Sequence, residues 1–340
     1  MGGLTRREAV KNAIARNGGG HTPWQVDFTS VYDEIYAKKY GGCLDTAFEN
    51  HILLAKYKKK TPIAPGSKIE TDLFNIKWDM SAEDGGDIGL PFDPPLADYE
   101  TDAYRFPEID KDFALGQLKK FDEDKNARYR LYGVTFTLYE RAWSLCGMEN
   151  LLAGMVAEPD FVHELMRRIV EHHIKLMDTV LNGEFDGVLF GDDWGSQNGL
   201  IMGAAHWRTF IKPYMKTLCR KAKDSGKQTI LHCCGDISEI LKEIIEIGVD
   251  CYNTVQPELY DLQKLKREYG RDLCFFGGIS NQGFLPYATP DEVETKCLKT
   301  LSVLAKGGGY ILSPTHSLTP DIPIENAFAI VKAAKKFNSD

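Results

Sequence analysis

A histidine and two adjacent cysteines lie near the end of a predicted strand, in the segment TILHCCGDIS (residues 229–238). Side chains alternate between the two faces of a strand, so His232 and Cys234 share one face and Cys233 points to the other. One imidazole and one thiolate suit zinc, and catalytic zinc sites combine three protein ligands with an open position. The two cysteines are adjacent and form no C-x-x-C redox motif. The spacing predicts a zinc site on His232 and Cys234.

The third ligand must come from another segment. His316 lies in SPTHSLTPD, just after the last predicted strand, and we expect it on the same rim. Cys251 and Cys274 fall early in their strands, which places them near the opposite end. The spacing alone is equally compatible with a polar rim histidine beside a buried cysteine.

The surrounding elements alternate β-rich runs with helical patterns. A helix is expected from Pro159, another is bent or interrupted at Pro213, and a third begins with a capping box at Thr289. Gly307–Gly309 follow a helix and precede a strand, which favours a helix end over a phosphate-binding loop. The predicted strands are 22–28, 72–79, 130–136, 186–193, 228–234, 250–256, 272–278 and 309–314.

Eight strand-helix units predict a single (β/α)8 barrel domain over residues 1–340, with an N-terminal helical extension in residues 1–20. A doubly wound open sheet is the alternative, but no G-x-G-x-x-G follows an early strand. In a barrel, chemistry belongs at the C-terminal ends of the strands. Those ends are polar, and although a single aspartate is usually a loop or cap residue, their coincidence indicates a site: Asp27, Asp79, Glu140, Asp192, Asp193, His232, Cys234, Gln256, Glu258 and His316.

The composition excludes several classes of protein. The chain has 340 residues, 41 Lys plus Arg against 49 Asp plus Glu, and a net charge of -8, with no basic stripe for nucleic acid. No signal peptide or membrane-spanning apolar segment is found, so we expect a cytoplasmic protein. The eight cysteines lack the short spacings of a disulfide framework.

Several ordered segments together resemble the uroporphyrinogen decarboxylase superfamily, particularly its corrinoid-dependent methyltransferase branch. The resemblance covers nearly the whole chain and implies a (β/α)8 barrel. The segments that carry it are DLFNIKWD, ERAWSLCGMENLL, DGVLFGDDWGSQNGLIM, HWRTFIKPYMKTL, GKQTILHCCGDI, GVDCYNTVQPE, LKREYGRDLCFFGGIS and GGGYILSPTHSLTPDIPIENAFAI.

Methyltransferases of this branch bind zinc through an H-x-C pair, matched here by His232 and Cys234, and through a later cysteine. His316 stands at that later position, so the chain departs from the thiol-methylating members. A neutral imidazole in place of a thiolate leaves more positive charge on zinc and makes it a stronger Lewis acid towards oxygen. This difference favours a methyl ether as the substrate.

The resemblance therefore implies a zinc-dependent methyltransferase that moves a methyl group from a small substrate, such as an aryl methyl ether, to cob(I)alamin. No D-x-H-x-x-G cobalamin motif is found, so the corrinoid is expected on a partner protein. The roles of three acidic residues stay open between metal coordination, orientation of a ligand and proton donation: Glu140, Asp192 and Asp193. The residues expected to contact the substrate are Trp78, Trp143, Trp194 and Gln256.

Three alternatives stay open. The first is methyl transfer from a methylated corrinoid to a thiol such as coenzyme M, which His316 disfavours. The second is uroporphyrinogen decarboxylation, which needs an N-terminal arginine-rich motif, whereas HTPWQVDFTSVYDEIY contains no arginine. The third is a non-catalytic zinc protein. Homodimers are common in the family, but no pattern in this sequence indicates an interface.

Overall fold

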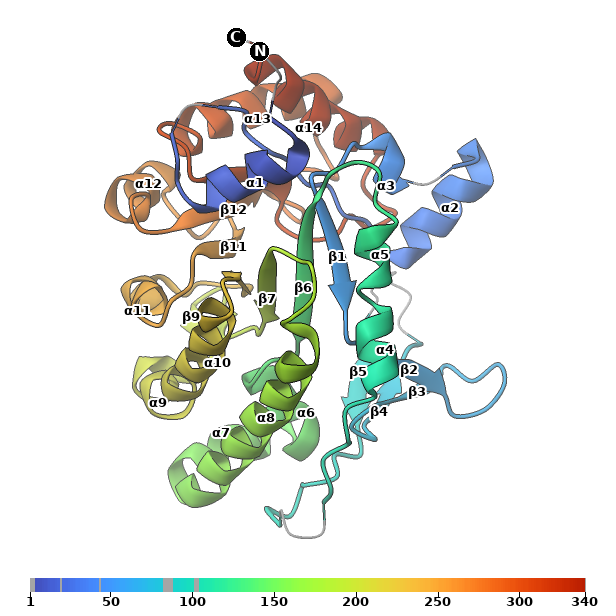
Figure 1. Ribbon diagram of the computed structural model, residues 1–340, viewed down its shortest axis with the longest axis vertical. Helices are drawn as coiled ribbons and strands as arrows, with labels where there is room; N and C mark the ends of the chain where they lie inside the picture. Colours follow the sequence, from blue (N-terminus) through green and yellow to red (C-terminus); the bar gives the residue numbers. More distant parts are fainter. Residues whose placement is uncertain (1–3, 19, 43, 82–87, 101–103, 340) are drawn as a thin grey trace.

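The computed structural model describes residues 4–18, 20–42, 44–81, 88–100 and 104–339. Its centre is a curled parallel sheet of seven strands in the order β1-β6-β7-β10-β11-β12-β13 (Figure 1). All six neighbouring pairs are parallel. The strands are β1 (Ile52–Lys56), β6 (Tyr129–Thr135), β7 (Gly187–Gly191), β10 (Gln228–His232), β11 (Cys251–Val255), β12 (Cys274–Ile279) and β13 (Tyr310–Pro314).

Helices form the crossovers that parallel strands require, and they pack outside the sheet (Figure 1). The longest, α8, buries ten residues along one side, including Leu165, Ile169 and Met177. The helices are α1 (Arg6–Ile14), α2 (Ser30–Tyr40), α3 (Leu44–Ala47), α4 (Lys111–Gly116), α5 (Lys119–Asp122), α6 (Tyr139–Cys146), α7 (Met148–Ala157), α8 (Pro159–Val180), α9 (Gly203–Phe210), α10 (Lys212–Asp224), the short 3-10 helix η1 (Ser238–Ile240), α11 (Leu241–Glu246), α12 (Leu262–Tyr269), α13 (Pro290–Leu304) and α14 (Ile324–Phe337).

The predicted strand at 22–28 is present as a bridging segment. The Gln25 amide donates to the Leu312 carbonyl at 2.9 Å, and the Leu312 amide donates to the Pro23 carbonyl at 3.0 Å. On the other side, the His51 amide donates to the Trp24 carbonyl at 3.3 Å. The segment thus lies between β13 and the start of β1, although it forms isolated bridges and no regular strand.

The predicted barrel strand at 72–79 is wrong. Residues of this segment, among them Trp78 and Asp79, instead belong to a separate four-stranded antiparallel sheet. This small sheet lies beside the central sheet (Figure 1). The position in the central sheet belongs to β1, which the sequence analysis missed. The small sheet contains β2 (Lys60–Pro62), β3 (Ile69–Asp72), β4 (Lys77–Asp79) and β5 (Leu90–Phe92), and a two-stranded ribbon is formed by β8 (Gly195–Ser196) and β9 (Gly199–Leu200).

Helix α1 lies within the residues expected to form an N-terminal extension and covers the N-terminal ends of the strands. Its Val10 and Ile14 belong to a buried cluster with Tyr129, Cys251 and Cys274. This placement confirms that the two cysteines lie early in their strands. They are therefore at the opposite end of the sheet from Cys234.

Three local predictions about helix boundaries are confirmed. Pro213 lies in the first turn of α10, directly after α9 ends. Thr289 forms a capping box with Glu292 at the start of α13. The run at Gly307–Gly309 has positive φ angles of 73–85° and connects the end of α13 to β13, as expected for a helix end.

Within the described residues, no helix is both long enough and apolar enough to cross a membrane. A cytoplasmic location stays a prediction.

Candidate functional site

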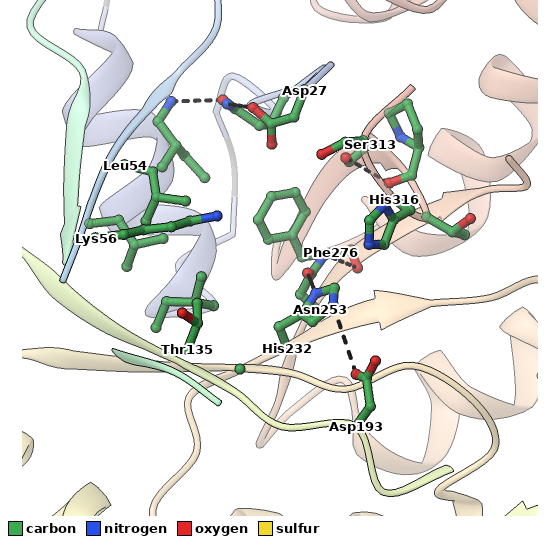
Figure 2. A pocket seen from close by; sticks show the side chains of 18 of the residues that line it. Asp27, Leu54, Lys56, Thr135, Asp193, His232, Asn253, Phe276, Ser313 and His316 are labelled. Atoms are coloured by element: carbon green, nitrogen blue, oxygen red, sulfur yellow. Dashed lines mark hydrogen bonds and ion pairs between the residues drawn. The ribbon is translucent and has the colours of Figure 1, made fainter. Parts of the chain in front are cut away.

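A cavity of about 250 Å³ opens at the C-terminal ends of the central strands (Figure 2). Both apolar and polar side chains line it. The lining residues are Gln25, Asp27, Ile52, Leu54, Lys56, Lys58, Ile88, Leu131, Thr135, Phe136, Glu140, Leu189, Gly191, Asp193, His232, Asn253, Phe276, Ser313, Pro314, Thr315, His316 and Ser317.

Three potential metal ligands group together at the edge of this cavity: Asp193 and His232 line it, and Cys234 lines a neighbouring hollow. One ligand atom from each lies within 4.8 Å of the other two. The Cys234 Sγ is 3.6 Å from the His232 Nε2, which is 3.9 Å from an Asp193 carboxylate oxygen. All three are partly buried. Thiolate, imidazole and carboxylate are the ligand types that zinc uses, so this donor set fits zinc.

Asn253 orients the imidazole of His232. In the parallel register, Asn253 on β11 is the direct partner of His232 on β10. The Asn253 side-chain oxygen lies 2.5 Å from His232 Nδ1, while its amide nitrogen donates to the Phe276 carbonyl at 3.3 Å. The oxygen accepts the proton of Nδ1, which leaves the Nε2 lone pair facing Cys234 and Asp193. Such a partner commonly orients a metal-ligating histidine.

Two glycines bring the loops after β7 and β10 together. A Cβ on Gly235 would come within 2.2 Å of the Gly195 backbone, and a Cβ on Gly195 would come within 2.7 Å of the Cys234 carbonyl. Gly235 also has a φ of +81°, which favours glycine. This contact lets the Asp193 carboxylate accept a hydrogen bond from the Cys234 amide at 2.7 Å. The glycines after both strands therefore help to assemble the cluster.

Asp192 and Asp193, although adjacent, have different environments. Asp192 is fully buried, and its carboxylate accepts from the backbone amides of Leu138, Tyr139 and Glu140 at 2.9–3.1 Å. It also accepts from the Trp194 indole. Asp192 thus satisfies the free amides at the start of α6, as an N-cap residue would. Burial raises its pKa to about 6 despite these bonds.

Glu140, in the first turn of α6, faces the cavity. Burial first, and the neighbouring Asp193 and Asp192 carboxylates second, raise its pKa well above the ordinary value. Glu140 thus lines the same cavity as Asp193 and His232, and its role stays a prediction.

The two adjacent cysteines separate as strand geometry predicts. Cys233 is fully buried and accepts a hydrogen bond from the Trp194 amide at 3.2 Å. Cys234 faces the cluster and is partly exposed. Burial and the nearby Asp193 carboxylate raise the pKa of the Cys234 thiol, so a bound cation is needed to favour the thiolate.

His316 lies on the same rim as His232, with ring centroids 6.0 Å apart in a T-shaped arrangement (Figure 2). The Asn281 side chain holds its backbone, donating to the His316 carbonyl at 2.9 Å and accepting from its amide at 3.3 Å. Desolvation of the ring by the surrounding protein lowers the pKa of the His316 imidazole. His316 lies outside the group of ligand atoms within 4.8 Å, and its role as a ligand stays a prediction.

The residues expected to contact substrate lie elsewhere. Trp78 belongs to the small antiparallel sheet, and Trp194 packs in the core against Trp207 at 5.5 Å. Trp143 lies behind Phe136, with ring centroids 6.3 Å apart. Gln256 accepts from the Gly235 amide at 2.6 Å and lines a neighbouring hollow. None of the four is among the described residues that line the cavity.

The sequence analysis also missed residues that do line the cavity. Phe136 and Phe276 provide its aromatic surface, and Asn253 supports His232. Lys56 and Lys58 also line the cavity, and Figure 2 shows Lys56 on the side opposite His232 and Asp193. The sequence signal that could have identified Lys56 is its position in ILLAK, because alternate residues of a strand share one face and Lys56 alternates with Ile52 and Leu54.

The family profile "Uroporphyrinogen decarboxylase (URO-D)" matches residues 93–337. The chain belongs to this family. A methylated-thiol–coenzyme M methyltransferase of Methanosarcina mazei is 26% identical over 229 residues, which cover 66% of this chain and 57% of the relative. A uroporphyrinogen decarboxylase of Coxiella burnetii is 21% identical over 189 residues, or 55% of this chain and 50% of the relative.

The matches thus span about half the length of these curated relatives. A solved structure described as a methyltransferase from Methanosarcina mazei superposes with a TM-score of 0.75 at 15% identity. It covers 98% of this chain and 99% of that chain. At this identity the superposition shows a shared fold.

Proposed function

We propose that this URO-D family protein is a zinc-dependent methyltransferase that takes a methyl group from an aryl methyl ether and transfers it to cob(I)alamin on a partner corrinoid protein. The observation that carries the proposal is the grouping of ligand atoms from Asp193, His232 and Cys234 within 4.8 Å of one another. Asp193 and His232 also line one cavity with Glu140. The methyltransferase name of one relative supports the reaction class.

In this proposal His232, Cys234 and Asp193 hold zinc, and His316 is near enough on the rim to replace Asp193 or join it after a side-chain movement. Zinc would supply Lewis acidity towards the ether oxygen. Asn253 keeps the Nε2 lone pair of His232 directed at the metal position. The Asp192 carboxylate is not assigned to the metal in this proposal, because it already accepts hydrogen bonds from the backbone amides at the start of α6 and from the Trp194 indole.

The reaction breaks the bond between the methyl carbon and the ether oxygen. The bonding electron pair stays on the oxygen, which takes a proton from Glu140 and leaves as a phenol. The methyl carbon bonds to cobalt, with both electrons supplied by cob(I)alamin. Glu140 is suited to this step because it lines the cavity, burial and the neighbouring carboxylates raise its pKa, and Asp192 accepts a hydrogen bond from its backbone amide.

We also propose that the bridging segment at residues 23–28 closes the curled sheet as its eighth member. Hydrogen bonds to Leu312 on one side and from His51 on the other support this closure. A closed wall would limit access to the cavity to the C-terminal end of the barrel, where TIM-barrel enzymes have their active sites. The corrinoid partner would approach from that end.

The test is to measure zinc per chain by elemental analysis, then to mix the zinc-loaded protein with cob(I)alamin and a panel of methoxyaromatics. The proposal predicts about one zinc and formation of the methylcobalamin spectrum with at least one ether. Two results together would contradict it: the protein binds no zinc, and none of the ethers methylates cob(I)alamin.

A second candidate is methyl transfer to or from a thiol, which the name of the Methanosarcina mazei relative favours. The discriminating feature is His316 at the position where the thiol-methylating members are expected to carry cysteine. Thiols belong in the same assay, and methyl transfer to or from a thiol but never from an ether would select this candidate.

Uroporphyrinogen decarboxylation has weaker support. No arginine is found among the described residues that line the cavity, so an octa-anionic substrate would have few counter-charges. A volume of about 250 Å³ also suits a single-ring molecule better than a tetrapyrrole. Typical pockets for drug-sized ligands measure about 300–1,000 Å³.

A further inference from the structure

Strand β1 carries an apolar-to-cationic gradient along its inward face. Alternate side chains of a strand share a face, and Ile52, Leu54 and Lys56 all line the cavity, followed by Lys58 beyond the strand. The gradient runs from the depth of the cavity towards its mouth. β1 therefore places an ammonium group above an apolar wall.

Gly133 makes room for this lysine. In the parallel register, Lys56 on β1 is the partner of Gly133 on β6. A Cβ at Gly133 would lie 3.1 Å from the Lys56 Cγ and 3.4 Å from the Leu54 Cδ1. The glycine leaves space for the Lys56 stem, so the stem lies along the wall while its charged end reaches the cavity.

The lysine and the ligand cluster lie on opposite sides of the cavity. Figure 2 shows the Lys56 ammonium pointing inwards from β1, while His232, Asp193 and His316 lie on the far side. The same cavity is also lined by apolar side chains, which include Leu54, Leu131, Phe136, Leu189 and Phe276.

This arrangement matches a small molecule with three parts: an anionic end, an apolar ring and a methyl-bearing end. We propose that Lys56 binds the carboxylate of the substrate, and that the substrates are methoxylated aromatic carboxylates. The proposal rests on the proposed function and specifies its substrate class. Asp27 lines the same cavity as Lys56. One of its carboxylate oxygens accepts a hydrogen bond from the Gln25 side chain at 2.7 Å.

The experiment compares 4-methoxybenzoate with the neutral 4-methoxybenzyl alcohol, using calorimetric binding to the wild type and to Lys56→Met. A hydrogen bond to a charged group contributes about 1.5–3 kcal/mol, so Lys56→Met should weaken 4-methoxybenzoate binding about 10–100-fold. Binding of the alcohol should change less than about twofold, since it makes no charged contact. KM in the methyl-transfer assay should follow the binding result.

Lys59→Met is the matched control, because Lys59 is an exposed lysine of the same run whose ammonium lies 5.7 Å from the Phe113 ring, outside the cavity lining. It should leave both affinities unchanged. Lys56→Arg should retain most of the 4-methoxybenzoate affinity, which separates loss of charge from loss of fold. Thermal unfolding of each variant checks that the fold is intact.

Benzoate, which has no methyl group to donate, separates this inference from the proposed function. Lys56-dependent binding of benzoate without methyl transfer from any ether would uphold the anion subsite and contradict the proposed function. Equal weakening of the acid and the alcohol, or no weakening of either, would overturn the role of Lys56. Lys56-dependent binding of 2-mercaptoethanesulfonate in clear preference to benzoate would overturn the aromatic substrate class.

Discussion

The two ends of β7 carry aspartates in opposite circumstances. Asp186, just before the strand, accepts from Arg7 and the Arg130 amide at 2.8–3.0 Å and pairs with Lys11 at 2.7 Å. Asp193, two residues after the strand, lies beside other acids and an imidazole. The same residue type thus stabilises the fold at one end and faces a cavity at the other. What differs is whether cations of the chain already neutralise it.

The cysteines repeat this contrast. Cys251 and Cys274 are sealed beneath α1 within an apolar cluster, whereas Cys234 is partly exposed and faces ligand atoms. Variants at the N-terminal ends of the strands should therefore change stability and leave metal binding intact. Variants at the C-terminal ends should do the reverse. Four measurements test this contrast, beginning with the largest expected effect.

Replacing Cys234 by Ala should abolish stoichiometric zinc binding, because it removes a ligand from a three-residue set. Zinc per chain is measured by elemental analysis after dialysis. The matched control is Cys233→Ala, which should retain zinc and lose some stability, because Cys233 is buried in packing. Equal zinc content in both variants would remove Cys234 from the site.

Replacing Asp186 by Asn should lower the free energy of unfolding by about 1.5–3 kcal/mol at neutral pH, because the buried carboxylate loses its charge-assisted hydrogen bonds from the partly exposed Arg7 and Lys11 side chains. Burial alone would raise the pKa of Asp186, but the bonds from Arg7, the Arg130 amide and Lys11 outweigh it and lower the pKa. The stabilisation is therefore present above the ordinary aspartate pKa of about 4 and is lost as pH falls through the lowered value.

Denaturant unfolding of both proteins at neutral pH and at progressively lower pH measures this effect. The difference between the wild type and Asp186→Asn should shrink in acid, while zinc binding at neutral pH stays unchanged. A constant difference across pH would mean that the charge of Asp186 is not the cause.

Replacing Asn253 by Ala should lower zinc affinity about 10–100-fold, the usual effect of removing the partner of a metal-ligating histidine. Competition with a chelator of known affinity gives the value. Because Asn253 is not itself expected to bind the metal, stoichiometric binding should return at high zinc concentration. Unchanged affinity would show that the bond to His232 Nδ1 does not orient the ligand.

Replacing Cys251 by Ala should have the smallest effect, about 1 kcal/mol of stability, which is typical of a modest change in a core. Zinc content should equal that of the wild type. Thermal unfolding and elemental analysis check the two outcomes. A loss of zinc in Cys251→Ala would break the contrast between the two ends of the sheet.

The central strands from β6 to β13 were predictable because each combines apolar, β-prone residues with a helix boundary on either side. Strand β1 was missed because ILLAK is short and continues into a lysine-rich run that resembles a solvated loop. The segment at 72–79 has an equally strong local pattern, and only its long-range partners place it in the antiparallel sheet. Local pattern cannot specify which sheet a strand joins.

The pairing of His232 with Cys234 followed from the two-residue period of a strand. The different environments of Asp192 and Asp193 could not be predicted in this way, because β7 ends at Gly191 and the two-residue period no longer applies to either residue. The start of α6 then decides that Asp192 becomes a helix cap. Predicting the contact of Asn253 with His232 requires the register of β10 against β11. Predicting that Lys56 lines the cavity requires the position of β1 in the sheet.

The contact between Leu312 and the segment around Trp24 has a consequence for biosynthesis. A ribosome releases residues 23–28 early, but their partner β13 emerges only after most of the chain has been made. Pairing across so large a sequence separation is entropically costly and slows folding. During translation the nascent protein therefore holds an incomplete sheet with unpaired edges, a state prone to association with other chains. Chaperone dependence in the cell would follow from this late step.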